Sequence, residues 1–382
     1  MLTGPRQSGK TTLLMHLFRD TAQYVSLEMP ANRAAALEDP DRFLDNHPPP
    51  VIFDEVQNAP ALFIYIKERI DQHRDRTGQY LLTGSQNLLL SERVSESLAG
   101  RVAVLRLLPL TRNEIIGSPQ RPFAWETERT HSPSEKIPEL WAGMIRGRYP
   151  ELIAKPHQDA TTWHGSYIET YLERDIRTLR QVGDLNAFQS FLQMLAARSG
   201  QLLNLTDISR DLGIAVNTAK NWLSVLEATY QVIVLRPYFE NTGKRLVKTP
   251  KVYFTDTGTL CYLVGLKDPD HAASGPMAGA IFEGAVLTEI IKTYFSRGER
   301  PRVYFWRTSA GMEVDFVVDI GNQQLVPIEA KMNATPRPAM ANAIQIFQKD
   351  YGSRAVEGYV VHPGDIRVPL GPKVTALPFA DL

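Results

Sequence analysis

Short apolar runs alternate with longer amphipathic stretches over the first third of the chain. The runs lie at residues 24–27, 51–53, 80–82 and 102–105, and segments with helical spacing of their apolar residues separate them. Short strands that alternate with helices are typical of βαβ units, whose strands pair in parallel. The pattern therefore predicts an α/β domain with a mainly parallel sheet over residues 1–117.

Stretches rich in proline and glycine divide the rest of the chain. Prolines punctuate a polar connector between residues 119 and 138, and a second stretch of this kind covers residues 268–279. Such residues interrupt regular structure. The block between them, 137–266, is expected to be mostly helical and to end in a β-hairpin. The third block, 280–382, shows a second α/β pattern, with a helix at 280–295, strands at 313–320 and 325–330, a helix at 338–349 and a strand at 358–361.

Charge and cysteine content limit the classes of function. The 42 Lys and Arg residues equal the 42 Asp and Glu residues, so any contact with nucleic acid needs a local basic patch. Cys261 is the single cysteine, which excludes an internal disulfide and a zinc site rich in thiolates. No apolar run is long enough to span a bilayer. We therefore expect a cytoplasmic protein without a membrane partner.

The N-terminal segment GPRQSGKT, residues 4–11, matches the phosphate-loop pattern G-x-x-x-x-G-K-[ST]. A glycine before the lysine lets backbone N–H groups approach a phosphate closely. Lys10 is expected to bind the β- and γ-phosphates of ATP, and the Thr11 hydroxyl to ligate Mg²⁺. The following run predicts a helix whose N-terminus faces the phosphates. The predicted ATP-binding residues are therefore Gly4, Pro5, Arg6, Gln7, Ser8, Gly9, Lys10, Thr11 and Thr12.

The strand expected before this loop is short. Only three residues precede Gly4, whereas strands of about 5 residues are usual. We therefore expect the chain to lack part of this strand.

Two carboxylates follow the apolar run at 51–53. Asp54 is predicted to hold the magnesium ion, and Glu55 to orient and deprotonate the attacking water. The run at 80–82 ends in polar residues, of which Ser85 and Gln86 are the candidates for contact with the γ-phosphate or the water. Arg101 is a candidate for an arginine finger, acting within the chain or on a neighbour, although a surface role is the more common one.

The middle block shows the pattern of a winged helix. Asn204 and Asp207 are placed to cap a first helix, Gly213 fits a turn, and residues 217–229 predict a second helix. Residues 232–255 would supply the β-hairpin. Five basic residues lie between positions 236 and 251, against the single acid Glu240: Arg236, Lys244, Arg245, Lys248 and Lys251. The second helix offers little for base contact, so DNA binding and protein docking both stay open.

The third block places an acid on one predicted strand and a Glu-x-Lys pattern on the next. Asp315 lies on the first, and Glu329 and Lys331 share a face of the second. Glu283 on the preceding helix adds a further carboxylate. The arrangement is similar to the restriction-endonuclease-like core, in which Asp and Glu hold a metal ion and Lys activates water. Such folds also survive as binding modules without cleavage.

Taken together, the three blocks resemble a broad prokaryotic family of AAA-type P-loop ATPases with a C-terminal domain of unknown function. The motifs that carry the resemblance are GPRQSGKTT at 4–12, DEVQ at 54–57, LTGS at 82–85, GR at 100–101, GRYPE at 147–151 and YLERD at 171–175. The leading hypothesis is an ATP-hydrolysing molecular switch. The alternatives are a magnesium-dependent nuclease gated by ATP, and a non-catalytic, ATP-responsive module that binds DNA, another protein or a second copy of the chain.

Overall fold

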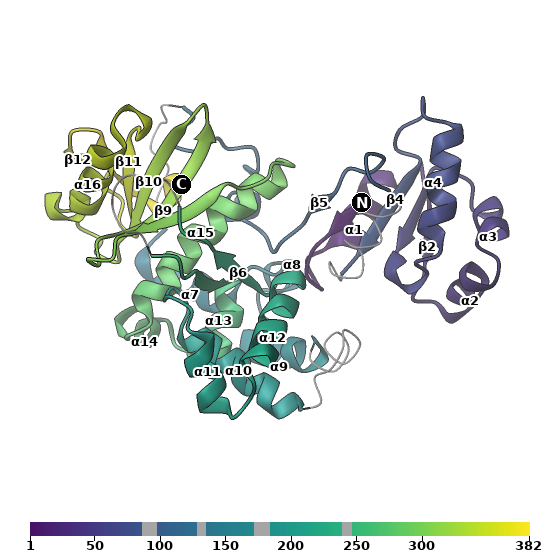
Figure 1. Ribbon diagram of the computed structural model, residues 1–382, viewed down its shortest axis with the longest axis horizontal. Coiled ribbons are helices and arrows are strands. Elements are labelled where there is room, and N and C mark those ends of the chain that lie inside the picture. Colours follow the sequence, from purple (N-terminus) through teal and green to yellow (C-terminus); the bar gives the residue numbers. More distant parts are fainter. Residues whose placement is uncertain (86–97, 128–134, 172–183, 239–246) are drawn as a thin grey trace. The chain divides into compact units, whose positions relative to one another are not determined.

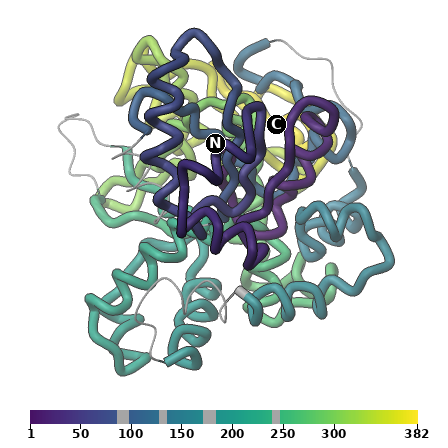
Figure 2. Tube along the Cα trace, turned by 90° about the vertical axis from the view of Figure 1, so that its right-hand side faces the viewer, coloured from purple at the N-terminus to yellow at the C-terminus, as the bar shows by residue number. Residues whose placement is uncertain are grey.

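The computed structural model describes residues 1–85, 98–127, 135–171, 184–238 and 247–382, and Figure 2 traces the chain through them. Several predictions from sequence fall outside these ranges, namely those for Gln86, Glu240, Lys244, Arg245 and most of the YLERD motif. By its internal contacts the chain divides into two compact units. One comprises Met1–Pro109 with Ser224–Gln231, and the other comprises Leu110–Leu223 with Val232–Leu382.

The first unit contains a five-stranded sheet, in which every pair of neighbouring strands is parallel (Figure 1). The strand order β2-β3-β4-β1-β5 confirms the expected α/β fold. Its strands are β1 (Leu2–Thr3), β2 (Gln23–Ser26), β3 (Val51–Asp54), β4 (Tyr80–Gly84) and β5 (Leu105–Arg106). The last strand is shorter and begins later than the apolar run at 102–105 predicted, because it pairs with the two residues of β1.

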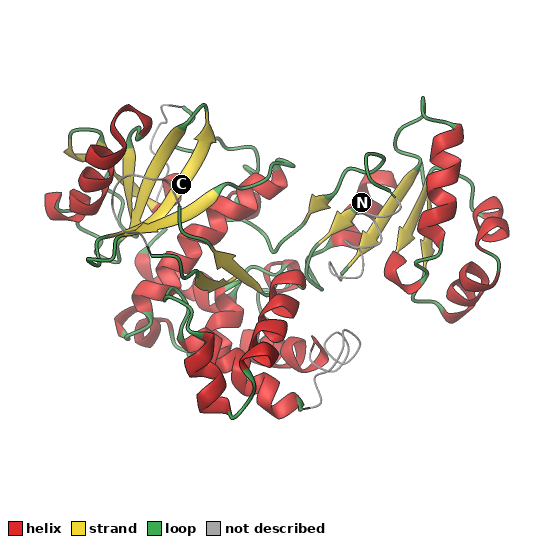
Figure 3. Cartoon of the chain, in the orientation of Figure 1, coloured by secondary structure: helices red, strands yellow, loops and turns green. Residues whose placement is uncertain are grey.

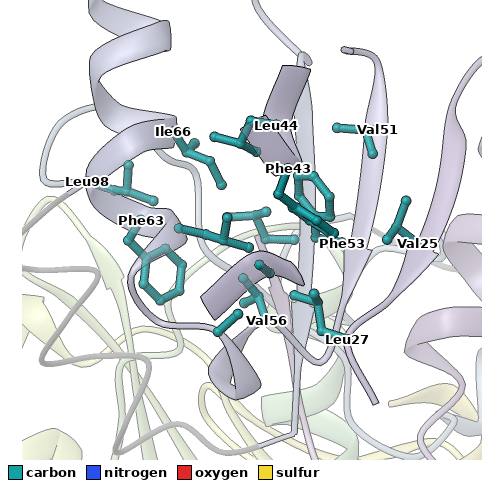
Figure 4. Close-up of a cluster of buried hydrophobic side chains, with 14 residues drawn as sticks. Val25, Leu27, Phe43, Leu44, Val51, Phe53, Val56, Phe63, Ile66 and Leu98 are labelled. Carbon is teal, nitrogen blue, oxygen red and sulfur yellow. The ribbon is translucent and has the colours of Figure 1, made fainter. Parts of the chain in front are cut away.

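Helices cover both faces of this sheet. They are α1 (Lys10–Phe18), α2 (Pro30–Glu38), α3 (Pro40–Asn46) and α4 (Leu62–Gln72). Successive residues of β3 point to opposite faces. Ile52 packs with Leu14 of α1 on one face. Val51 and Phe53 pack with apolar residues of α2, α3 and α4 on the other. Figure 4 shows this second cluster, in which Phe43 lies against Phe53.

The second unit begins with a mainly helical region (Figure 3). Its elements are α6 (Arg112–Ile115), α7 (Ile137–Arg146), α8 (Pro150–Ala154), α9 (Ala160–Tyr171), α10 (Leu185–Ala197), α11 (Leu205–Leu212), the first part of α12 (Val216–Ala228), β6 (Val232–Leu235), β7 (Lys251–Phe254), α13 (Thr257–Leu263) and α14 (Pro269–Ser274). The residues of α12 from Ser224 onward belong to the first unit. None of the helices in the described ranges is long and apolar enough to span a membrane.

The helix pair α11 and α12 forms as the sequence predicts. Asn204 caps α11, since its side chain accepts hydrogen bonds from the backbone of Thr206 and Asp207. Gly213 ends α11 in the left-handed conformation, at φ 66°, which glycine adopts without strain. Strands β6 and β7 then pair antiparallel. Two helices followed by a hairpin agree with the winged-helix interpretation, which stays a prediction.

The C-terminal part of the second unit is a six-stranded mixed sheet of order β12-β13-β11-β10-β9-β8. The strands are β8 (Val303–Arg307), β9 (Glu313–Gly321), β10 (Gln324–Ala330), β11 (Gly358–His362), β12 (Val368–Gly371) and β13 (Val374–Pro378). Helix α15 (Ala278–Ser296) and helix α16 (Asn342–Tyr351) accompany the sheet. Ile344, Phe347 and Tyr351 of α16 pack on it at helical spacing. Strands β8, β12 and β13 were not predicted.

Candidate functional site

The phosphate loop connects β1 to α1. Gly4 has φ 154°, and a Cβ atom there would lie 2.0 Å from the backbone oxygen of Leu107, so only glycine fits. Gln7 and Gly9 also have positive φ, at 61° and 90°. These turns bring the loop to the N-terminus of α1, where Gly9 provides no side-chain cap. The first N–H groups of α1 are therefore without a side-chain cap and available to an anion.

Polar side chains of the loop fit a phosphate ligand. The Ser8 hydroxyl oxygen is buried and has no hydrogen-bond partner among the described residues. Lys10 is also buried, and its Nζ donates to the backbone oxygens of Gly4 at 3.0 Å and Pro5 at 2.7 Å. A buried ammonium is costly unless it is compensated, and these carbonyl groups hold it at the loop. The loop therefore places a cation and a buried hydroxyl where a phosphate would enter.

Asp54, at the end of β3, connects the loop to the centre of the sheet. Its carboxylate accepts a hydrogen bond from the Thr11 hydroxyl, which lies 3.0 and 3.2 Å from the two carboxylate oxygens. The Tyr24 hydroxyl on β2 donates to Oδ2 at 2.8 Å, and the Thr83 hydroxyl on β4 donates to Oδ1. The structure thus brings together Thr11 and Asp54, the two residues predicted to hold magnesium. Oxygen ligands of this kind suit Mg²⁺.

Tyr24 and Thr83 were not predicted as site residues. Each lies within an apolar strand pattern, and the pattern alone does not show that its hydroxyl turns to Asp54. Burial and the hydrogen bond to Asp54 raise the pKa of Tyr24 to about 12, so its hydroxyl keeps its proton and donates to the carboxylate. A carboxylate that is fixed by several donors keeps its orientation for a metal ion.

Glu55 follows Asp54 in the left-handed conformation, with φ 54° and ψ 51°. Such a backbone is unusual for a residue other than glycine, and it turns the Glu55 side chain away from the direction that the strand would give it. The Glu55 oxygen Oε2 accepts from the Ser85 hydroxyl at 3.0 Å and from the Ser85 backbone N–H at 3.3 Å. Gln57 donates to the same oxygen. Glu55 and Ser85, which were predicted separately as the base and as a contact for the γ-phosphate or the water, are therefore in direct contact, and Gln57 joins them.

Arg101 is engaged elsewhere in the same unit. Its guanidinium forms a two-point ion pair with Asp71 of α4, at 2.8 and 2.9 Å, and it also donates to the backbone oxygen of Ala99. Bidentate pairs of this kind fix the guanidinium in place. This arrangement does not support a finger role within the chain, and a role on a neighbouring copy stays a prediction.

Family models match the chain in three parts. An AAA domain matches residues 1–116, a domain of unknown function (DUF8612) matches residues 137–270, and a second (DUF4143) matches residues 278–382. An uncharacterized protein of Mycobacterium tuberculosis is 30% identical over 379 residues, which cover 99% of this chain and 79% of the relative. The chain belongs to the family of AAA-domain proteins with a C-terminal domain of unknown function.

More distant similarity extends to an archaeon. An uncharacterized protein of Methanocaldococcus jannaschii is 20% identical over 368 residues, which cover 92% of this chain and 78% of the relative. Among solved structures, a RuvB variant of Thermotoga maritima matches 61% of this chain and 80% of its own, at 17% identity. Its TM-score is 0.28. Membership among AAA domains makes nucleotide the expected ligand of the phosphate loop.

The C-terminal domain of this family member gathers the acids that the sequence singled out. The Ala330 backbone N–H donates to Asp315 Oδ2 at 2.9 Å. Lys331 forms an ion pair with Glu329 and lies 3.9 Å from Asp315. Burial, with a contribution from Asp315, raises the pKa of Glu329 well above its ordinary value. Asp315, Glu329 and Lys331 therefore lie together, as predicted.

Glu283 on α15 belongs to the same cluster, and burial raises its pKa to about 7. Its carboxylate accepts from the Tyr253 hydroxyl and forms an ion pair with Lys251. Burial alone would lower the pKa of Lys251, but the carboxylates of Glu283, Asp315 and Glu313 raise it above its ordinary value. Lys251 therefore carries its charge inside the cluster.

One prediction needs correction, namely the exposure of Lys251. Lys251 is buried, with 3% of its side chain exposed, so it takes no part in a basic surface patch. Of that patch, the structure describes Arg236 and Lys248 as exposed. The described residues also contain no group of three His, Cys, Asp or Glu side chains in metal-binding geometry. The magnesium site predicted at Asp315 and Glu329, with Glu283 and Lys331, rests on two carboxylates and stays a prediction.

Proposed function

We propose that this chain is a magnesium-dependent ATPase that hydrolyses ATP to ADP and phosphate and acts as a molecular switch. The observation that carries the proposal is the contact between Glu55 and Ser85, beside a carboxylate that already binds Thr11. A nucleotide-binding module that does not hydrolyse ATP has no need of a second carboxylate, held by hydrogen bonds, at the end of β3. A general base must be positioned in this way to accept a proton from water.

Each residue of the site has a separate role in the proposed reaction. Lys10 pairs with the β- and γ-phosphates, and the N-terminus of α1 adds its backbone N–H groups. Thr11 and Asp54 would hold the magnesium ion, which supplies positive charge to the phosphate oxygens. Glu55 orients the attacking water and accepts its proton, while Ser85 keeps the carboxylate in position.

Phosphate release from Mg-ATP tests the proposal with wild type, Lys10→Ala and Glu55→Gln. The controls are Lys67→Ala and Glu68→Gln on α4. We expect Glu55→Gln to keep nucleotide binding but to lose turnover by roughly a hundredfold or more, because it removes the general base. Lys10→Ala should lose both binding and turnover. If wild type binds ATP and releases no phosphate, the non-catalytic module replaces the ATPase.

A DNA-dependent response is a second proposal. It is supported by the helix pair α11 and α12, the β6–β7 pairing and the exposed Arg236 and Lys248 beside these strands. The same phosphate-release assay with added duplex DNA tests it. DNA contact would be supported if duplex DNA stimulates phosphate release by wild type, and if the double variant Arg236→Ala, Lys248→Ala shows weaker stimulation. Unchanged turnover at every DNA concentration would leave protein docking as the role of the hairpin.

A further inference from the structure

Lys251 begins strand β7 and ends inside the acid cluster of the C-terminal domain. Its Nζ lies 3.0 Å from Glu283 Oε1 on α15 and 2.5 Å from Glu313 Oε1 on β9. The ammonium also lies 5.6 Å from the centre of the Phe305 ring, within the range of a cation–π contact. Helix α15 and strands β8 and β9 therefore each place a side chain against one buried positive charge on β7.

The other charges of the cluster are paired as well. Arg307 forms an ion pair with Glu313 at 2.7 Å, and Lys331 pairs with Glu329. The cluster thus contains the carboxylates of Glu283, Glu313, Asp315 and Glu329 and the cations of Lys251, Arg307 and Lys331. Its net charge is −1 when every group is ionised. Buried carboxylates need such compensation.

A divalent metal ion in this cluster would compete with Lys251 for the oxygens of Glu283 and Glu313. Mg²⁺ takes oxygen ligands in near-octahedral geometry at about 2.1 Å. An ammonium 3.0 Å from the Glu283 oxygen would repel such an ion strongly in a buried setting. Glu329 retains one buried oxygen, Oε1, without a partner among the described residues. Oxygen ligands therefore remain for an ion once the lysine is removed.

We propose that Lys251 is the resident cation of this acid cluster and takes the place of a catalytic metal ion. The C-terminal domain of the native chain then binds no divalent cation at Asp315 and Glu329 and does not cleave DNA. Its cluster instead anchors β7 to α15 and β9. Lys251 adds a charged contact to the backbone hydrogen bonds that already join this hairpin region to β8, such as that between Tyr238 and Phe305.

Binding of Mn²⁺ to the full chain without nucleotide tests the proposal, by electron paramagnetic resonance of the free ion. All proteins carry Asp54→Asn, so that the phosphate site contributes no metal binding. We expect no Mn²⁺ site in the parent chain at millimolar ion. Lys251→Met should gain one site, with affinity roughly tenfold or more above the parent. Adding Asp315→Asn to Lys251→Met should abolish this gain.

Removal of the lysine leaves Glu283 buried without its cation, so Lys251→Met is compared with Lys251→Met, Glu283→Gln. The double variant removes the stranded charge and keeps Asp315, Glu313 and Glu329. It should also bind Mn²⁺, and circular dichroism checks that both variants fold. Lys267→Met, at an exposed lysine, is the matched control and should resemble the parent.

Two results would overturn the proposal. The first is evidence of a metal site in the parent chain. Such evidence is either one bound Mn²⁺ that Asp315→Asn removes, or metal-dependent nicking of supercoiled DNA that Asp315→Asn abolishes. The second is no gain of Mn²⁺ binding in either folded lysine variant, because Lys251 would then not be the group that excludes the ion. Neither measurement involves ATP hydrolysis. The role of Lys251 and the proposed ATPase activity are therefore tested independently of each other.

Discussion

The Tyr24 hydroxyl on β2 donates a hydrogen bond to Asp54 Oδ2 on the neighbouring strand β3, at 2.8 Å. Asp54 also accepts from Thr11, the other residue of the proposed magnesium site. The tyrosine therefore acts on the metal site through the carboxylate that it holds. Its own pKa of about 12 keeps it a donor throughout the physiological pH range.

Tyr24→Phe removes this hydrogen bond and little else. We expect the Mg²⁺ concentration for half-maximal ATP hydrolysis to rise roughly tenfold, because outer hydrogen bonds to metal ligands commonly contribute this much to affinity. Titration of Mg²⁺ at saturating ATP measures the change. Tyr65→Phe on α4 is the control and should match wild type. An unchanged Mg²⁺ dependence in Tyr24→Phe would mean that Thr11 and Thr83 alone orient Asp54.

Ser85→Ala tests the positioning of Glu55. The Ser85 hydroxyl donates to a carboxylate, and such a hydrogen bond contributes about 1.5–3 kcal/mol. If the full free energy of this hydrogen bond stabilises the transition state, Ser85→Ala should lower kcat roughly ten- to a hundredfold and leave the KM for ATP unchanged. Steady-state phosphate release gives both constants, with Ser274→Ala as the control. A rise in KM at constant kcat would instead place Ser85 in ground-state binding.

Gly4→Ala should disrupt the phosphate loop. Its φ of 154° is one that L side chains rarely adopt, and the added Cβ would lie 2.0 Å from the Leu107 oxygen. We expect the AAA domain to lose about 1–3 kcal/mol of unfolding free energy or more, together with ATP affinity. Gly143→Ala on α7 is the control, since nothing lies within 4 Å of its added Cβ. That change should stabilise α7 by roughly 0.5–1 kcal/mol. Thermal unfolding and nucleotide binding measure both effects.

Lys292 on α15 predicts a pH dependence of stability. Burial lowers its pKa from 10.5 to about 8, Asp256 and Glu114 oppose this, and Arg148 adds to it. The unfolded chain then binds more protons than the folded chain between pH 8 and 10.5, so stability rises with pH across that window. Below pH 8 the cost of the buried charge is fully present, up to about 3 kcal/mol.

Lys292→Met removes this charge. Urea unfolding at pH 7.5 and pH 10 measures the free energy of unfolding. At pH 7.5 the variant should be more stable than wild type, and its stability should increase much less than that of wild type between pH 7.5 and pH 10. Lys267→Met, at an exposed site, should keep the wild-type rise. A rise of equal size in wild type and Lys292→Met would assign the pH dependence to other groups.

The grouping of residues around the phosphate loop could be predicted in large part from sequence, because they fall in short motifs at the ends of neighbouring strands. The loop at 4–12 and the pair Asp54 and Glu55 each belong to a local motif, and a parallel sheet brings the ends of β3 and β4 together. The same argument placed Ser85 at this edge as a contact for the γ-phosphate or the water, and its hydrogen bond to Glu55 was not predicted. Tyr24 and Gln57 did not, since a hydroxyl in an apolar strand and an amide after a turn carry no local signal of their contacts.

The burial of Lys251, by contrast, could not be predicted from sequence. A lysine in a basic stretch predicts an exposed side chain, and its burial depends on acids 32 and 62 positions further along the chain. Arg101 was difficult for a related reason, because its partner Asp71 lies on helix α4 and outside any strand-end motif. Long-range ion pairs follow from the tertiary fold and not from local patterns, so neither partner could be recognised in advance.

The position of Lys251 also limits how this family can diverge. A change of the lysine alone leaves Glu283 without its cation and Glu313 with Arg307 only, and a change of either acid alone leaves a buried ammonium less compensated. Substitutions at these three positions should therefore occur together across the family. Relatives that carry an apolar residue at the position of Lys251 are expected either to have lost these acids or to have regained a metal ion.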